Sequence, residues 1–371
     1  MNLHRYGRLA GVALVGVLAL TACGTDENTP AGGGGATTGA QAANIKCAQG
    51  KINAQGSTAQ GNAMDTWTKV YQQTCGSGSS INYQGTGSGA GIKAFIQGQA
   101  AFAGSDSALK PEEKPQADAR CKTGQALNLP MVVGPIAVAY NLQGVQDLQL
   151  SPETVAKIFD GKITKWDAPE IKADNPGKTL PSLPIQAFHR SDESGTTENF
   201  TKYLKATSNG AWTHEPAKAW KGAGGQGVNK SSGVANAVKG ANGAIGYMEV
   251  SYAQNSGLSI AKLKNGAGEY VALTDEAVGK AVEAAQVVGQ GNDLALKLDY
   301  TTKAPGAYPL ILVTYEITCE KGLPAEELAL VKSFLAYTAS KEGQNAIKAQ
   351  GYSPLPESLR AKVAQAVESL S

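Results

Sequence analysis

"LPMVVGPIAVAYNL", residues 129–142, is a nearly unbroken run of apolar side chains in a chain of 371 residues. A strand with one face in water alternates apolar and polar side chains, whereas a strand covered on both faces is apolar throughout. Residues 129–142 are therefore predicted to form a strand that is buried on both faces. This places a layered α/β core at the centre of the fold.

Strand and helix patterns alternate on both sides of this run. Strand patterns occur at residues 51–56, 80–85, 100–107, 183–190, 243–250 and 308–319. Amphipathic helix patterns occur at residues 57–75, 88–99, 151–161, 196–207, 231–240 and 324–340. Such alternation predicts α/β architecture with mostly parallel sheets.

The N-terminus has the features of an export signal. Arg5 and Arg8 precede an apolar run over residues 9–20, and the next residues lead to Cys23. A basic start, a short apolar core and small residues before the cut are typical of a signal peptide. Leu20-Thr21-Ala22-Cys23 resembles a bacterial lipobox, so we expect residues 1–22 to be removed and Cys23 to carry lipid. An ordinary signal peptide with an incidental cysteine is the alternative.

Residues 24–43 contain no aromatic side chain and little aliphatic bulk. A segment of this composition cannot bury enough apolar surface to order itself. Residues 23–43 are therefore predicted to be a lipid-anchored flexible tether. The globular part would then work at the outer face of the cell membrane, outside the cytoplasm.

The charge balance excludes some partners. The chain has 33 basic and 31 acidic residues, and the numbers become equal once residues 1–22 are removed. A neutral body is a poor electrostatic partner for nucleic acid, so none is expected. The two histidines beyond residue 22 are His189 and His214. They are too few for a histidine-based metal site, and we expect no metal.

Four cysteines follow Cys23. An even number in an exported chain favours two disulfides, although the sequence leaves three connectivities open. Because Cys47 precedes the first strand and Cys75 ends the first helix pattern, we favour a Cys47–Cys75 pair. Cys121 and Cys319 would form the other pair.

Three strand-to-helix junctions combine glycine with hydroxyl side chains. They are Gly56-Ser57-Thr58, Gly87-Ser88-Gly89 and Ser194-Gly195-Thr196. Backbone N–H groups at a helix start have no internal partner and favour anions. Serine and threonine are also common helix caps, so one junction alone has little significance. Three of them together indicate an anion site.

Arg190 and Asp106 define which anion would fit. The Arg190 guanidinium suits a phosphate or a carboxylate, and Asp192 could fix its orientation. Asp106 in "AGSDSALK" would repel an anion unless that anion carries a proton for it to accept. Phosphate carries such a proton near neutral pH, whereas sulfate does not. These residues predict a site for protonated phosphate.

Enzyme motifs are incomplete in this chain. "GTGSGA", residues 85–90, follows a strand as a dinucleotide fingerprint would, but an exported protein meets little NAD. Gly177-Lys178-Thr179 ends like a Walker A loop whose first glycine is missing, because residue 172 is lysine. No serine stands in a Gly-x-Ser-x-Gly elbow. We therefore expect no enzyme activity and no cofactor.

Six segments resemble, in order, the substrate-binding proteins of the high-affinity phosphate ABC importer. They are "GSTAQ", "NYQGTGSGAGIKAF", "FAGSDSAL", "GKITKWDAPEI", "HRSDESGTTENF" and "GAIGYMEVSYA". The resemblance runs from about residue 52 to the end of the chain. It implies a two-lobe type II periplasmic-binding-protein fold, α/β with mixed, mainly parallel sheets and two crossover strands. Lobe I would comprise residues 44–132 and 310–371, and lobe II residues 133–309.

The resemblance also implies a ligand set, carried over position by position. Phosphate would be bound by Thr58, Ala59, Ser88, Asp106, Arg190, Ser194, Gly195 and Thr196, with Asp192 behind Arg190. One departure is Ala59, which stands where the family often has a bulkier aromatic residue. His189 occupies a position that is often basic, and its role stays open.

The predicted function is capture of inorganic phosphate and its delivery to ABC permease subunits by a monomer anchored through Cys23. Two alternatives remain. One is an exported phosphate-ester hydrolase with an activated serine such as Ser194. The other is an adhesin-like or sensory lipoprotein of the same fold whose ligand is a partner protein.

Overall fold

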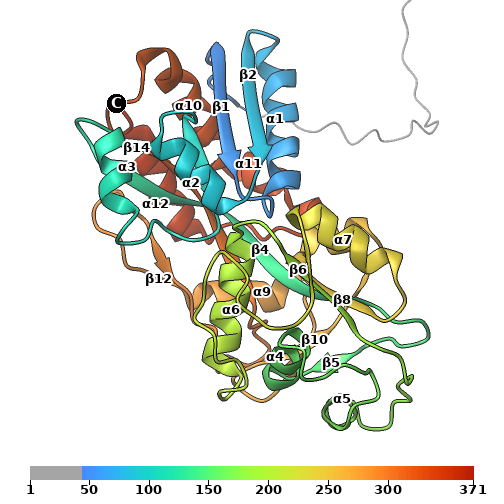
Figure 1. Cartoon of the computed structure of the whole chain (residues 1–371). Coiled ribbons are helices and arrows are strands. Elements are labelled where there is room, and N and C mark those ends of the chain that lie inside the picture. Colours follow the sequence, from blue (N-terminus) through green and yellow to red (C-terminus); the bar gives the residue numbers. More distant parts are fainter. Residues whose placement is uncertain (1–43) are drawn as a thin grey trace, which may run out of the picture. The chain divides into compact units, whose positions relative to one another are not determined.

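The computed structural model of this chain describes residues 44–371 (Figure 1). The predicted signal peptide, the tether and the lipidation site at Cys23 lie outside the described residues. Within them, no helix has both the length and the apolar composition needed to cross a membrane.

Strands and helices alternate along the described chain. The strands are β1 Gly50–Gly56, β2 Ser79–Gly85, β3 Phe102–Ser105, β4 Ala126–Asn141, β5 Gln149–Leu150, β6 Gln186–Arg190, β7 Gln226–Val228, β8 Ala244–Glu249, β9 Ser259–Ile260, β10 Lys262–Lys264, β11 Tyr270–Val271, β12 Gln286–Val287, β13 Leu296–Lys297 and β14 Ile311–Cys319. The helices are α1 Gly61–Cys75, α2 Ser88–Ile96, α3 Lys114–Arg120, α4 Pro152–Phe159, α5 Pro169–Asp174, α6 Gly195–Thr207, α7 Lys230–Gly240, α8 Val250–Asn255, α9 Asp275–Glu283, α10 Ala325–Thr338, α11 Lys341–Ala346 and α12 Glu357–Glu368, with a 3₁₀ turn at Lys348–Gln350.

One mixed sheet runs through residues 44–371. Its strand order is β2-β1-β3-β14-β4-β8-β6-β7, and β9 pairs with β4 beside this path. Pairing is parallel at both ends of the sheet, among β1, β2 and β3 and among β6, β7 and β8. It is antiparallel in the middle, where β14 pairs with β3 and β4, and β4 pairs with β8.

The long strand β4 joins the two halves of this sheet. Every residue from Ala126 to Tyr140 is buried, as the apolar run predicted. The first half of β4 pairs with β14 up to Pro135, and the second half pairs with β8 from Ile136 onward. We call the part built on β1, β2 and β3 lobe I and the part built on β6, β7 and β8 lobe II. The two-lobe α/β fold with crossing strands is thus confirmed, whereas its expected residue limits stay a prediction.

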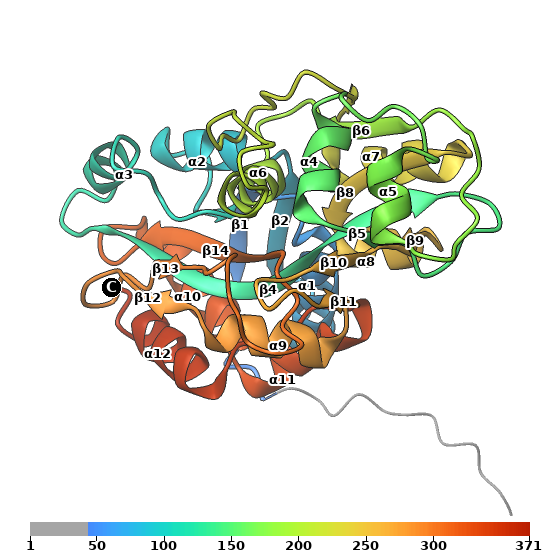
Figure 2. The same ribbon diagram turned by 90° about the horizontal axis from the view of Figure 1, so that it is seen from below.

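Helices cover both faces of the sheet. In Figure 2, α9, α10, α11 and α12 lie on one face of the central strands, and α2, α4 and α6 lie on the other. The fully buried side chains include Trp67 of α1, Phe95 of α2 and Phe334 of α10. These apolar faces hold the strand ends in place, and the polar residues discussed below follow those ends.

Side-chain capping fixes some helix starts, among them that of α4. Ser151 accepts a hydrogen bond from Thr154 N, and Pro152 begins α4, as predicted. The first helix departs from expectation, because α1 begins at Gly61 and not at Ser57. Residues 57–60 form a turn instead, in which the Ser57 hydroxyl accepts from Ala59 N at 3.0 Å. A serine side chain that bonds nearby backbone in this way competes with helix formation.

Both favoured disulfides are present. Cys47 pairs with Cys75, 28 residues apart, and Cys121 pairs with Cys319, 198 residues apart. The second bond ties the end of α3 to the end of β14. It therefore closes a very long loop within the described chain.

Candidate functional site: a buried anion-binding cluster

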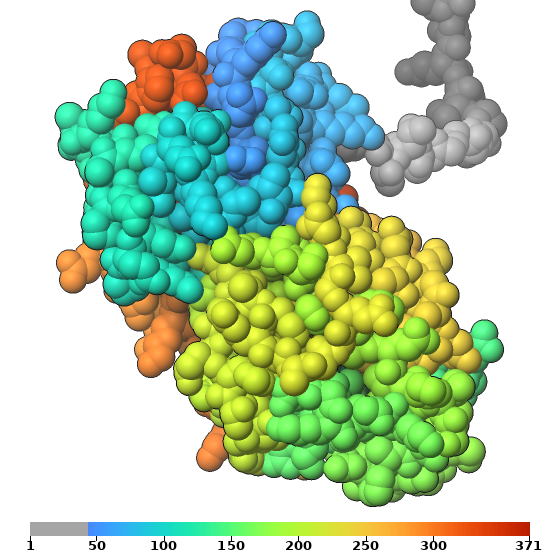
Figure 3. All heavy atoms as spheres, viewed as in Figure 1, coloured from blue at the N-terminus to red at the C-terminus, as the bar shows by residue number. Residues whose placement is uncertain are grey.

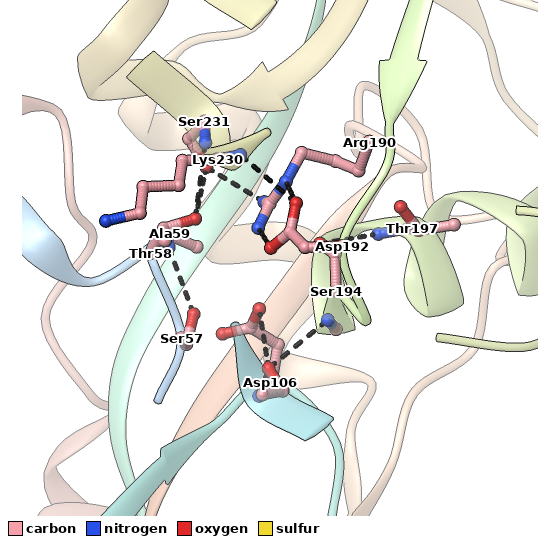
Figure 4. A network of polar contacts seen from close by, with 12 residues as sticks. Ser57, Thr58, Ala59, Asp106, Arg190, Asp192, Ser194, Thr197, Lys230 and Ser231 are labelled. Atoms are coloured by element: carbon pink, nitrogen blue, oxygen red, sulfur yellow. Dashed lines mark hydrogen bonds and ion pairs between the residues drawn. The ribbon is translucent and has the colours of Figure 1, made fainter. Parts of the chain in front are cut away.

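The predicted ligand residues converge at the ends of strands from both lobes. Thr58 follows β1, Asp106 follows β3, Arg190 ends β6, and Ser88 and Ser194 stand at the starts of α2 and α6. All eight predicted ligand residues are buried. Figure 4 shows Thr58, Asp106, Arg190 and Ser194 arranged around a common space. The structure therefore brings together residues separated by up to 138 positions (Thr58 to Thr196).

Arg190 is a buried cation held by several acceptors. Its Nε donates to Asp192 Oδ1 at 2.7 Å, and its Nη2 donates to Asp192 Oδ2. Nη1 donates to Ser231 Oγ at 3.2 Å. Burial acts to raise the pKa of Asp192, but the hydrogen bonds and charge of Arg190 outweigh it and leave that pKa below its ordinary value. Asp192 thus stays ionised and fixes the guanidinium plane, as the sequence suggested.

Asp106 is a buried acceptor on the opposite side of the cluster. Thr314 Oγ1 donates to its Oδ1 at 2.8 Å, and Ser88 Oγ lies 3.4 Å from its Oδ2. Burial raises the pKa of Asp106, against the opposing effects of Ser57, Thr314 and Arg190. A carboxylate of raised pKa is a stronger proton acceptor than an ordinary aspartate. This is the property expected of a group that accepts a proton from a bound anion.

Two junction hydroxyls accept hydrogen bonds from backbone N–H groups of the junctions in this structure. Gly195 N donates to Ser88 Oγ at 3.2 Å, and Ala59 N donates to Ser57 Oγ at 3.0 Å. Two of the predicted backbone donors are therefore satisfied by side-chain oxygens. Thr196 Oγ1, in contrast, is buried and has no hydrogen-bond partner within the described chain. Such a hydroxyl is available to a small polar ligand.

Two members of the cluster were not predicted. Ser231 at the start of α7 contacts Thr58 and Arg190, and Thr314 of β14 holds Asp106. Ser231 could have been found, because "NKSSG" repeats the pattern of a hydroxyl and glycine where a helix begins. Thr314 gave no signal, since it lies inside an apolar strand pattern. Only the pairing of β14 with β3 brings it to Asp106.

His189 has a packing role in this structure. Its ring stacks on Trp220, with the ring centres 4.6 Å apart, and its Nδ1 lies 2.9 Å from the Arg190 carbonyl. Burial lowers the pKa of His189, so the neutral ring is favoured. His214 is paired with Asp160 at 2.8 Å. Ser194 caps α6 through Thr197 N, and neither histidine is hydrogen bonded to it, so a serine hydrolase site gains no support.

Contacts between the lobes surround the cluster. Thr58 and Ser231 bond at 2.8 Å, Gly89 N donates to the Glu193 carbonyl at 3.1 Å, and Lys218 pairs with Glu113 at 2.8 Å. In the space-filling view, the cyan surface of lobe I meets the yellow-green surface of lobe II (Figure 3). Binding groups from both lobes are therefore held against one another. Residues 44–371 contain no cluster of His, Cys, Asp and Glu suited to a metal ion.

Comparison with known proteins agrees with this fold. Residues 37–342 match the PBP superfamily domain. The chain is 44% identical, over 100% of both sequences, to phosphate-binding protein PstS 3 of Mycobacterium tuberculosis. It is 32% identical to phosphate-binding protein PstS of Haemophilus influenzae, covering 78% of this chain and 84% of that protein.

Solved structures show the same fold. A high-affinity periplasmic phosphate-binding protein, PfluDING, superposes with a TM-score of 0.69 at 24% identity, covering 85% of this chain and 93% of that chain. The phosphate-binding protein from Stenotrophomonas maltophilia superposes with a TM-score of 0.67 at 20% identity, over the same shares.

Fold and site together define a two-lobe binding protein whose buried cluster is suited to a small oxyanion. The sequence matches then identify its family: the chain belongs to the PstS phosphate-binding proteins of the PBP superfamily. Its relatives are named as binding proteins, which confirms the expectation of a binding protein and not an enzyme.

Proposed function

We propose that this protein binds one inorganic phosphate between its lobes and delivers it to an ABC-type permease. The observation that carries the proposal is the opposition of Arg190 and Asp106 within one buried cluster. A fixed cation attracts the anion, and an acceptor-only carboxylate requires that the anion bring a proton. Protonated phosphate satisfies both groups, whereas sulfate leaves Asp106 facing another negative charge.

In this proposal the ligand set is that expected from the sequence, extended by Ser231. Thr58, Ser88 and Asp106 would bind from lobe I, and Arg190 and residues 194–196 from lobe II. Because the ligand bonds to both lobes at once, it stabilises the closed arrangement more than an open one. The permease would recognise that closed arrangement as the loaded state.

The proposed place of work is the outer face of the cell membrane. The signal pattern of residues 1–22 and the lipobox-like residues 20–23 support export and lipid attachment at Cys23. The protein would act as a monomer held by its tether. Replacing Cys23 by alanine should move the exported protein from the membrane fraction to the medium or periplasm, and continued membrane retention would contradict the anchor.

Calorimetry on the tag-free, unlipidated protein tests the binding function. We expect 1:1 phosphate binding that excess sulfate barely reduces. Thermal unfolding should also shift upward as phosphate is added, because a ligand that binds only the folded state stabilises it. A protein that binds no phosphate would overturn the proposal. Turnover of a chromogenic phosphate ester that requires Ser194 would favour the hydrolase instead.

A further inference from the structure

Three tyrosine hydroxyls bind the backbone of the Ser57–Ala59 turn from outside it. Three consecutive carbonyl oxygens of the turn each accept a hydrogen bond from a different tyrosine. The bonds, each 2.7 Å long, run from Tyr83 Oη to Ser57 O, from Tyr252 Oη to Thr58 O and from Tyr352 Oη to Ala59 O. The tyrosines come from β2, from α8 and from the segment after the 3₁₀ turn, so only the folded chain brings them together.

Each of these bonds also fixes the direction of an N–H group. A peptide unit is planar and trans, so its C=O and its N–H point in opposite directions. Donors that hold the carbonyls of residues 57–59 therefore direct the N–H groups of residues 58–60 to the other side of the turn. Ala59 N donates there to Ser57 Oγ at 3.0 Å, and Figure 4 shows the Ser57 side chain between Ala59 and Asp106. The N–H side of the turn thus faces the anion-binding cluster.

Tyr252 differs from the other two donors because it comes from lobe II. It lies on α8, which follows β8 directly, whereas the turn follows β1 of lobe I. A second bond links the same elements, since Asn62 Nδ2 donates to Ser251 Oγ at 2.7 Å. The Thr58 carbonyl also accepts from Gly61 N at 3.1 Å, so Tyr252 binds its second lone pair. The orientation of this carbonyl therefore depends on both lobes.

Gly61 gives the Tyr252 hydroxyl room to reach the turn. A Cβ atom at position 61 would lie 2.6 Å from Tyr252 Oη, closer than two such atoms can approach. The Gly61 backbone does not adopt a positive φ, and alanine is the better helix former at the start of α1. The close approach of Tyr252, and not the backbone conformation, therefore explains the glycine.

We propose that Tyr252, together with Tyr83 and Tyr352, positions the N–H groups of the Ser57–Ala59 turn before phosphate binds. None of the three tyrosines touches the ligand in this proposal, which rests on the proposed phosphate function. Their effect on affinity comes from preorganisation, because donors that are already aimed need not be ordered when the anion binds.

Tyr252→Phe removes the hydroxyl and keeps the ring. We expect phosphate affinity to fall about fivefold, because the Thr58 carbonyl loses one of its two donors. Tyr71→Phe is the matched control, since Tyr71 lies near the other end of α1 and its buried hydroxyl bonds with Ser333 at 2.6 Å. The control should lower the unfolding temperature of the ligand-free protein to a similar extent but leave affinity within about twofold. Equal affinities in the two variants would overturn the inference.

A second variant displaces the hydroxyl without removing it. Gly61→Ala should weaken phosphate binding about as much as Tyr252→Phe, because the new methyl group pushes Tyr252 Oη away from the turn. Gly279→Ala on α9 is its control, since a Cβ atom there meets no other atom within 4 Å. The double variant Gly61→Ala, Tyr252→Phe should bind about as well as either single variant, because both changes remove the same bond. Additive losses of affinity would contradict a shared cause.

Nuclear magnetic resonance of the Ala59 amide tests the positioning without any ligand. The nitrogen that follows the Thr58 carbonyl senses a hydrogen bond to that carbonyl, so its resonance should shift in Tyr252→Phe and stay in place in Tyr71→Phe. An unshifted resonance in Tyr252→Phe would contradict the positioning role. Failure of the unmodified protein to bind phosphate would overturn the proposed function, whereas the Ala59 resonance would still decide whether Tyr252 holds this peptide unit.

Discussion

Thr58 and Ser231 stand 173 residues apart in the chain, yet their buried hydroxyl groups hydrogen bond at 2.8 Å. Thr58 belongs to the turn after β1 in lobe I, and Ser231 lies at the start of α7 in lobe II. Ser231 also accepts from Arg190. Ser231 therefore links lobe II to lobe I and also contacts Arg190, the proposed anion-binding arginine.

Replacing Ser231 by alanine should reduce phosphate affinity about tenfold, because one buried bond across the lobes is lost and Arg190 loses an acceptor. Calorimetry measures this change. Ser232→Ala on the exposed side of the same helix is the control and should leave affinity unchanged. Equal affinities in the two variants would show that the link between the lobes does not contribute to binding.

Replacing Asp106 by asparagine should change selectivity more than affinity. The amide can donate to an unprotonated anion, so sulfate should begin to compete while phosphate binding weakens less. Competition calorimetry with both anions gives the ratio of the two dissociation constants. A parallel loss for phosphate and sulfate would contradict the role assigned to this carboxylate.

Arg190→Lys keeps the charge but loses the planar fork that Asp192 and Ser231 hold. Phosphate affinity should fall about 10- to 100-fold, since hydrogen bonds to a charged group are worth about 1.5–3 kcal/mol. Arg360→Lys is a matched control, because Arg360 pairs with Glu357 on α12. Unchanged phosphate affinity in Arg190→Lys would show that binding does not need the guanidinium geometry.

Glu249 should make stability depend on pH. Burial raises the pKa of this fully buried carboxyl group to about 8, from an ordinary value of 4.5. The folded state favours the protonated acid, so its contribution is complete below about pH 4.5 and is lost as the pH rises to about 8, at about 1.4 kcal/mol per pH unit. Chemical denaturation at several pH values should show a shallower decline in Glu249→Gln than in the unmodified protein. Identical slopes would contradict the raised pKa.

The two disulfides should differ in their contribution to stability. In the chain-entropy description, closing loops of 28 and 198 residues stabilises by about 3.6 and about 5.3 kcal/mol. The double variant Cys121→Ser, Cys319→Ser should therefore unfold at lower denaturant than Cys47→Ser, Cys75→Ser. The opposite order would mean that native contacts around Cys47 and Cys75 outweigh loop entropy.

Much of the fold could be predicted from the sequence, since strand patterns occur where β1, β2, β3, β4, β6, β8 and β14 lie. The start of α1 was predicted four residues early, because a serine that can cap a helix can also form a turn. Alternating patterns also gave no sign that β14 runs antiparallel to both of its neighbours. Strand direction depends on how the connecting segments cross, which local propensity does not encode.

The sequence by itself determined the chemical groups of this protein: the buried strand of residues 129–142, the hydroxyl-rich junctions, Arg190 with Asp192, and Asp106. Each is a local property, set by side-chain type and by spacing of a few residues. Tertiary structure alone decided that Ser231 meets Thr58 and that Thr314 meets Asp106. Such contacts form only when the folded chain brings distant residues into one low-dielectric interior, where a polar group without a partner is costly.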